Sequence, residues 1–138
     1  MILLTSFMSL IFVILAIIHL TWAIGSTWGL ESALPADPKT GKVVIYPSTS
    51  ITLFVAFGLL ACAFIYFINP EPGNPKNWIF DWGRVIVPVL FVLRAIGDFK
   101  YVGLTKKIKG TRFSAMDTKF YTPLCLCISA LGALITRL

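Results

Sequence analysis

Long runs of apolar residues without a formal charge are the feature that most limits how this chain can fold. The first run extends from Ile2 to Ile24 and is interrupted only by hydroxyl side chains and one histidine. A helix of about 20 apolar residues spans the roughly 30 Å hydrocarbon core of a bilayer. Because 57% of the residues are hydrophobic and 13% are charged, one soluble core could not bury them all. The sequence therefore predicts an integral membrane protein.

Four segments are predicted to form transmembrane helices. Their approximate ranges are 2–24, 48–68, 78–103 and 118–138. The second follows Pro47, begins with hydroxyl residues that suit a helix cap, and stops at Asn69-Pro70. The third needs its charged flanks to reach across a bilayer, and Pro88 predicts a kink within it. We therefore expect an all-α membrane protein in which residues 1–138 form a single four-helix transmembrane bundle.

The N-terminal ends of the first and fourth segments allow two further predictions. The first apolar run has no preceding Lys or Arg and is longer than the roughly 7 to 15 apolar residues of a signal peptide. We therefore expect it to remain in the protein as a membrane helix. In the fourth segment, Asp117 and Thr118 are candidate N-caps, and Pro123 is expected within the first turns.

The distribution of basic residues predicts the orientation in the membrane. If four helices alternate, residues 25–47 and 104–117 lie on one side, while residues 69–77 and both termini lie on the other. Near the helix ends, the first side has eight basic residues: Lys39, Lys42, Lys100, Lys106, Lys107, Lys109, Arg112 and Lys119. The second side has three: Lys76, Arg84 and Arg137. By the positive-inside rule, the first side is cytoplasmic and both termini are outside.

The net charge of +6 is explained by these residues beside the membrane. No nucleic-acid-binding motif is present, so nucleic acid is not expected as a partner. Membrane lipids are the expected partners, and the basic third loop could also attract anionic head groups. An ordinary topology signal has the same appearance, so both interpretations of the basic loop stay open.

Small and polar residues form a stripe on the first segment and another on the fourth. Both stripes follow alternate steps of three and four residues: Thr5, Ser9, Phe12, Ala16, His19, Ala23 and Ser26, then Thr122, Cys125, Ser129, Gly132 and Thr136. Such stripes let helices approach closely in lipid. The three cysteines form no C-x-x-C pair, and the chain has a single histidine. Thiol redox chemistry, a metal site and a bound cofactor are therefore not expected.

Polar and aromatic side chains gather at the predicted cytoplasmic end of the bundle. Arg94 and Asp98 lie four residues apart on the third segment, so we expect them to form an ion pair with each other. The predicted pocket is lined by His19, Trp22, Arg94, Asp98, Tyr101 and Tyr121, with Arg112 and Asp117 at its mouth. The alternative is a structural network in which the same side chains only join the helices.

Several of these residues belong to segments that resemble a known family. The segments are HLTWA at 19–23, WGL at 28–30, ALP at 33–35, RAIGDFKYVG at 94–103, TRF at 111–113, DT at 117–118 and YTPLC at 121–125. They resemble a family of small bacterial four-helix integral membrane proteins that is classed only as a domain of unknown function. The resemblance covers essentially the whole chain and implies a location in the bacterial cytoplasmic membrane. It implies no activity.

Three functions remain open at this point. The first is binding or transport of a small amphipathic molecule, lipid or ion in the predicted pocket. The second is a membrane enzyme that uses His19 or Asp98 as acid or base on a lipid-soluble substrate. The third is a structural subunit that packs in a membrane complex through the small-residue stripes. A channel would require a homo-oligomer, because a four-helix protomer has little room for its own aqueous path.

Overall fold

The computed structural model describes residues 1–68 and 75–137. Regular structure in these ranges is helical, apart from an isolated antiparallel bridge between Ala36 and Val43. The long helices are α1 (Ile2–Ala23), α3 (Thr49–Phe67), α4 (Trp78–Ile96) and α6 (Thr122–Arg137). The shorter elements are α2 (Leu30–Ala33), a 3₁₀ turn (Pro75–Asn77), α5 (Arg112–Met116) and a π-helical turn (Asp117–Tyr121).

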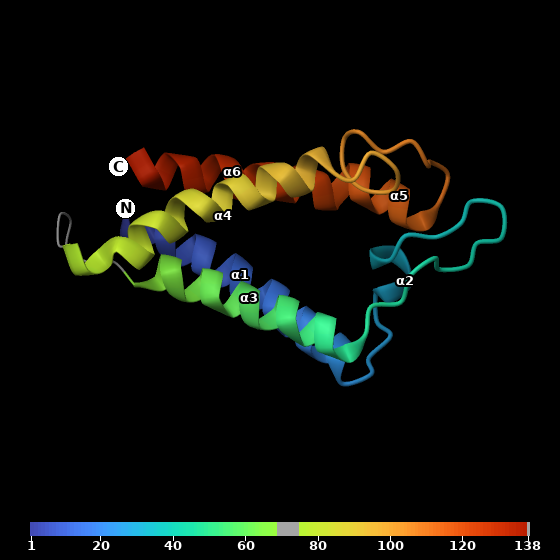
Figure 1. Ribbon diagram of the computed structural model, residues 1–138, viewed down its shortest axis with the longest axis horizontal. Coiled ribbons are helices and arrows are strands. Elements are labelled where there is room, and N and C mark those ends of the chain that lie inside the picture. The colour runs from blue at the N-terminus through green and yellow to red at the C-terminus, as the bar shows by residue number, and fades with distance from the viewer. Residues whose placement is uncertain (69–74, 138) are drawn as a thin grey trace.

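The long helices form two antiparallel pairs, α1 with α3 and α4 with α6. Both chain termini lie at one end of the molecule, which we call the termini end (Figure 1). Helices α2 and α5 lie at the opposite end, which we call the loop end. The two pairs approach each other near the termini end and diverge toward the loop end (Figure 1).

Three helical segments are long and apolar enough to cross a membrane: Ile2–Ala23, Thr49–Phe67 and Arg112–Arg137. Large apolar side chains on their outer faces are exposed, as expected for helices that face lipid. Helix α4 is not among the three, since it carries Asp81, Arg84 and Arg94. The prediction of a helical fold is confirmed for the described residues, and three of the four expected spans are long and apolar enough to cross a membrane.

The buried core lies in the half of the molecule near the termini end and joins the two helix pairs. It consists of Met8, Phe12, Ala63, Tyr66, Val87, Ile128 and Ile135. Phe12 of α1 stacks on Tyr66 of α3, with ring centroids 5.8 Å apart. Phe12 also contacts Phe91 of α4 at 5.5 Å. The two helix pairs are in contact through α3 with α4 and through α1 with α6, and this aromatic cluster fills the space between them.

Hydroxyl side chains of α6 compensate for the proline in α4. Pro88 has no N–H, so the carbonyl of Arg84 lacks the donor that an ordinary helix would provide. The Thr136 hydroxyl lies 3.1 Å from this carbonyl and 2.8 Å from the Gly132 carbonyl of its own helix, so the two carbonyls share its single proton. Ser129 donates to the Pro88 carbonyl at 2.9 Å. Such side-chain donors are a recognised way to satisfy a proline-containing membrane helix.

Gly132 brings α6 into direct contact with the other helices. A Cβ atom at this position would lie 2.5 Å from Cγ of Pro88 and 2.8 Å from the Tyr66 hydroxyl. On α1, the buried residues Thr5, Ser9, Phe12 and Ala16 follow the predicted stripe. Ser9 donates to the carbonyl of Ala63 on α3 at 2.9 Å. The stripes on the first and fourth segments are therefore helix-packing faces.

The third predicted helix is too long at its C-terminal end. Helix α4 ends at Ile96, because Gly97 has φ 92° and turns the chain away from the helix. A Cβ atom at Gly97 would overlap the carbonyl of Val102, so the turn requires glycine. The chain then folds back, and the Leu104 amide donates to the Ala95 carbonyl at 2.8 Å.

The fourth helical segment begins earlier than predicted, at Arg112. Thr111 is its N-cap and accepts a hydrogen bond from the Ser114 amide at 3.0 Å. Asp117 and Thr118 therefore lie inside the segment and do not cap it. The π-helical turn ends at Tyr121, two residues before Pro123, whose missing N–H interrupts the regular bonding pattern.

The second helix agrees with the sequence prediction. Ser48 caps α3 by accepting a hydrogen bond from the Ile51 amide at 3.3 Å. The predicted helix breaker Asn69-Pro70 and the last residue of the predicted fourth helix, Leu138, lie outside the described residues.

Candidate ligand-binding site

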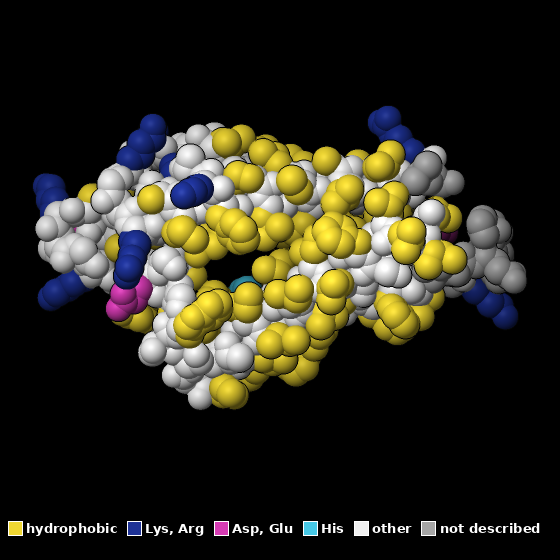
Figure 2. All heavy atoms as spheres, turned by 180° about the vertical axis from the view of Figure 1, so that it is seen from behind, with side chains coloured by type: hydrophobic (Ala, Val, Ile, Leu, Met, Phe, Trp, Pro, Cys, Tyr) yellow, Lys and Arg dark blue, Asp and Glu magenta, His cyan; other side chains and the backbone are white. Residues whose placement is uncertain are grey.

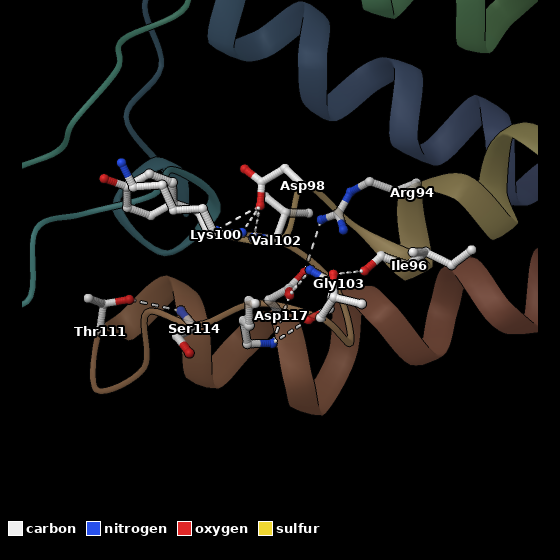
Figure 3. A network of polar contacts seen from close by, with 12 residues as sticks. Arg94, Ile96, Asp98, Lys100, Val102, Gly103, Thr111, Ser114 and Asp117 are labelled. Atoms are coloured by element: carbon white, nitrogen blue, oxygen red, sulfur yellow. Dashed lines mark hydrogen bonds and ion pairs between the residues drawn. The ribbon is translucent and has the colours of Figure 1, made fainter.

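Asp117 is the centre of a buried group of charges at the loop end. Its side chain is 0% exposed. One carboxylate oxygen accepts from Nη2 of Arg94 at 3.0 Å, and the other accepts from Nζ of Lys106 at 2.9 Å. The amide of Gly103 donates to the second oxygen at 2.8 Å. Figure 3 shows these donors converging on Asp117 from α4 and from the loop that follows it. We call Arg94, Lys106 and Asp117 the charge cluster.

Burial differs among the three members of the charge cluster. The Lys106 side chain is 5% exposed, and its ammonium also donates to the Gly103 carbonyl at 3.2 Å. The Arg94 side chain is 36% exposed, although its Nη1 atom is buried and has no hydrogen-bond partner within residues 1–68 and 75–137. Arg94 is therefore the member through which the cluster reaches a surface.

The predicted ion pair between Arg94 and Asp98 is wrong. The i to i+4 rule applies only within a helix, and α4 ends between the two residues, at Ile96. Arg94 pairs instead with Asp117, which lies 23 residues further along the chain. Both residues form polar contacts, but Arg94 pairs with a different carboxylate from the one that helical spacing predicts.

Asp98 organises the loop after α4. Its Oδ1 atom accepts hydrogen bonds from the amides of Lys100 at 2.9 Å, Tyr101 at 2.7 Å and Val102 at 2.8 Å, as Figure 3 shows. Partial desolvation raises the pKa of this carboxyl, but the three amide donors outweigh it and hold the pKa below its ordinary value. Asp98 is therefore a turn-forming residue on an exposed loop.

An opening separates the two helix pairs beyond the aromatic contact between Phe12 and Phe91. Arg94 follows Phe91 by three residues on α4, and His19 follows Phe12 by seven on α1. Residues at these spacings share a helix face, so both side chains continue the facing surfaces of α1 and α4. Figure 2 shows the opening from behind, bordered by hydrophobic side chains. The histidine colour appears at its edge, and the chain has one histidine.

The hydrogen bond of His19 defines its tautomer. Nδ1 lies 2.7 Å from the carbonyl of Leu15, and a carbonyl oxygen only accepts, so Nδ1 carries the proton. In the neutral ring, Nε2 is then left as an acceptor. The ring also contacts Trp22 edge-to-face, with centroids 5.0 Å apart. The Trp22 indole donates to the Trp28 carbonyl at 2.7 Å, which fixes this aromatic pair at the end of α1.

Contacts between the first and third connections close the loop end. The Tyr121 hydroxyl donates to the Ser32 carbonyl at 3.2 Å. Arg112 forms an ion pair with Glu31 at 3.3 Å, and both side chains are mostly exposed. Helices α2 and α5 are also in contact. Two surface cavities of about 550 and 490 Å³ flank this junction, and Arg112 and Glu31 line both of them.

The predicted pocket residues therefore divide into separate places. Of these eight residues, all in the described part of the chain, Arg112 alone lines the two surface cavities. His19 and Arg94 continue the faces that border the opening, while Asp117 supports Arg94 from behind. The ammonium of Lys100 lies over the ring of Tyr101, with Nζ 5.1 Å from the ring centroid. Lys106 contributes to the sequence analysis only through the count of basic residues that predicts the membrane orientation. Its burial against Asp117 is not predicted there.

Potential metal ligands and cysteine thiols are dispersed over the described residues. Within residues 1–68 and 75–137, no group of three His, Cys, Asp or Glu side chains is placed to hold a metal ion. Cys62, Cys125 and Cys127 are free thiols. The chemistry that the arrangement can supply is hydrogen bonding and charge at one end of an apolar opening.

Comparison with known proteins gives one match. The model of the family described as "Protein of unknown function (DUF3995)" matches residues 12–132. No curated protein and no solved structure matches the chain. The matched range contains α3, α4 and the charge cluster and most of α1 and α6. The chain belongs to this family of proteins of unknown function, DUF3995.

Proposed function

We propose that this chain is a multi-pass membrane protein that binds a small amphipathic molecule in the opening between its two helix pairs. This proposal rests on the divergence of the two helix pairs beyond the contact between Phe12 and Phe91 (Figure 1), which leaves an opening bordered by hydrophobic side chains (Figure 2). An apolar chain suits this border, while Arg94 and His19 offer polar contacts to a head group. Like the proposed ligand, the site therefore has an apolar part and a polar part.

The membrane placement rests on the composition of the helices. Three helical segments are apolar enough to cross, and α4 packs along the third of them, Arg112–Arg137. In the proposed fourth span, Arg94 is paired with Asp117, as intramembrane charges require. Arg84 donates to the Ile68 carbonyl at 2.7 Å. A bacterial cytoplasmic membrane with both termini outside fits the eight basic residues predicted for the cytoplasmic side against three on the other.

Binding is favoured over acid–base catalysis by the state of the two candidate catalytic groups. Three backbone amides occupy Oδ1 of Asp98, so this carboxylate is committed to the loop. His19 faces the opening, but the charge cluster supplies no adjacent nucleophile. Hydrogen bonding to a head group needs only what His19 and Arg94 already present.

The proposal is tested by filling the opening. Ala23 follows His19 by four residues on the same face of α1 and is half-buried, whereas Ala61 is exposed on α3. The protein, purified in a neutral detergent, is photolabelled with a long-chain alcohol that carries a diazirine near the middle of its chain. We expect labelled peptides from α1 and α4, with labelling lost in Ala23→Phe and retained in Ala61→Phe. Equal labelling of all helices, unchanged in Ala23→Phe, would contradict the proposal.

A further inference from the structure

The charge cluster is not neutral. It contains two cations, Arg94 and Lys106, and one anion, Asp117, so one positive charge is left over. Asp117 and Lys106 are buried and balance each other, so the excess positive charge lies on Arg94, whose side chain is 36% exposed. Asp98 does little to balance it, because its side chain is exposed and its Oδ1 atom is bound by loop amides. A partly desolvated excess charge of this kind is stabilised by an added anion.

Unsatisfied polar atoms accompany this excess charge. Nη1 of Arg94 is buried and has no hydrogen-bond partner in the described ranges. Oγ1 of Thr122 is in the same condition, and Thr122 directly follows the π-helical turn that begins with Asp117. Buried donors without partners are uncommon and call for an explanation. The Arg94 atom belongs to the charge cluster, so a donor without an acceptor coincides there with the excess of positive charge.

The opening gives such an anion access to Arg94. The Arg94 side chain is 36% exposed, although its Nη1 atom is buried and its Nη2 atom is bound to Asp117. Arg94 follows Phe91, which contacts Phe12 of α1, by three residues on α4. His19 continues the opposing face of α1, and its Nδ1 proton is already used by the Leu15 carbonyl. Nε2 therefore accepts from a protonated head group when the ring is neutral and donates to an anion when the ring is protonated.

We infer that the ligand is an acidic amphiphile, an alkyl or prenyl chain with a phosphate or carboxylate head, whose anion binds Arg94 from the opening. This inference rests on the proposed function and specifies its substrate class. Asp117 and Lys106 act as positioning residues, because Asp117 orients the guanidinium and Lys106 adds to the positive charge behind it. Guanidinium binds carboxylate and phosphate through paired charge-assisted hydrogen bonds, which a neutral alcohol or a cation does not form.

The test compares amphiphiles that share one chain and differ in the head. The intact protein in a neutral maltoside detergent is titrated with dodecyl phosphate, dodecanoate, dodecanol or dodecyltrimethylammonium, and also with inorganic phosphate alone. The readout is the shift of the thermal unfolding midpoint with concentration. We expect the two acids to stabilise the protein, dodecanol to bind more weakly, and the cation to give no stabilisation. Inorganic phosphate alone should have little effect, because it has no chain to enter the opening.

Two variants assign the effect to the site. Arg94→Lys keeps a cation for Asp117 but removes the guanidinium fork, and we expect dodecyl phosphate to bind roughly tenfold to a hundredfold more weakly. His19→Leu should also weaken binding while leaving the charge cluster untouched, so the inference stays testable if Arg94→Lys unfolds. The control is Arg137→Lys, since Arg137 is an exposed cation at the C-terminal end of α6, away from the loop end, and it should bind like the parent.

The outcomes separate the inference from the proposed function. Equal binding of dodecanol and dodecyl phosphate, unchanged in Arg94→Lys and His19→Leu, would overturn the acidic head group and leave the amphiphile site intact. Equal stabilisation by inorganic phosphate would overturn the need for a chain. No binding by any of the amphiphiles would remove the proposed function as well.

Discussion

The two helix pairs of this protein are held together by different means. Helices α1 and α3 pack through small and apolar side chains, with Ser9 donating to the carbonyl of Ala63. Between α4 and α6, Ser129 donates to the Pro88 carbonyl and Thr136 donates to the Arg84 carbonyl. An ion pair also joins Arg94 of α4 to the helical segment that continues into α6. Polar contacts are thus concentrated in the second pair.

The difference matches the composition of the four long helices. Helices α1 and α3 are each apolar enough to cross by themselves, whereas α4 carries charged residues and a proline. Charges and an unsatisfied carbonyl are costly in hydrocarbon, so α4 needs a neighbour that supplies partners. We therefore expect α4 to depend on α6 more strongly than α1 depends on α3. The following substitutions test this expectation, from the largest effect to the smallest.

Loss of the buried carboxylate should have the largest effect. Asp117→Asn leaves Arg94 and Lys106 without their anion while keeping the size of the side chain. Removing one partner from a buried ion pair typically costs about 3 to 5 kcal/mol. We expect a loss of this size in the free energy of unfolding, measured by denaturant titration in mixed micelles. Adding Lys106→Met should recover part of the loss, because it removes one of the uncompensated charges.

An exposed ion pair is the matched control for Asp117. Glu31→Gln breaks the pair with Arg112, whose side chain is 77% exposed. Exposed pairs contribute roughly 0 to 1 kcal/mol, so this variant should unfold almost like the parent. If Asp117→Asn and Glu31→Gln cost the same, the charge cluster does not hold the second pair together.

The positions of the helices could be predicted because apolar runs and caps are local signals. Ser48 was identified as a cap from its type and position, and the hydroxyl–glycine stripes were identified from their spacing. The end of the third helix was missed because Gly97 is compatible with a helix interior. Only the return of the chain, which brings the Val102 carbonyl against Gly97, shows that the turn is required.

The candidate site was harder to predict, because its contacts are not local. Arg94 was paired with the nearest acidic residue at helical spacing, but Asp98 lies beyond the end of α4 and binds loop amides. Asp117 was expected at a pocket mouth and instead lies buried at the centre of the cluster. No periodic pattern marks Lys106 as buried, because its environment is created by the fold of residues 97–117.

Steric contact at Gly132 gives the second largest expected effect. In Gly132→Ala, the new methyl group would meet Pro88 and the Tyr66 hydroxyl at 2.5 and 2.8 Å, so the helices must move apart. Overpacking of this kind costs about 1 to 3 kcal/mol. Gly58→Ala on α3 is the control, since a Cβ there meets nothing within 4 Å. A Gly132→Ala variant as stable as Gly58→Ala, in the same unfolding titration, would show that α6 does not depend on this close approach.

Removing a hydroxyl donor should have a smaller effect, and its size should differ between the two helix pairs. Thr136→Val removes the hydroxyl that the Arg84 carbonyl, whose helical donor is missing at Pro88, shares with the Gly132 carbonyl. Ser9→Ala removes the donor to the Ala63 carbonyl, on a helix without such a proline. Hydrogen bonds between membrane helices average about 0.6 kcal/mol, with a maximum near 1.7. We expect Thr136→Val near the upper value and Ser9→Ala near the average, by unfolding in bicelles. The reverse order would contradict the comparison.

The smallest effect is expected outside the membrane, in the loop that Asp98 organises. Because the folded pKa of Asp98 is below the ordinary value of 3.8, its carboxylate stabilises the loop above that value. The stabilisation is lost as the pH falls through the folded pKa. At neutral pH, Asp98→Asn should speed hydrogen exchange at the amides of Lys100, Tyr101 and Val102, with little change in global stability. The difference from the parent should shrink when the parent is also protonated.

Asp37→Asn is the matched control for Asp98→Asn, since Asp37 accepts from the Lys39 and Thr40 amides. It should affect only its own turn, and faster exchange across all four long helices in Asp98→Asn would mean that this loop supports the α4–α6 pair itself.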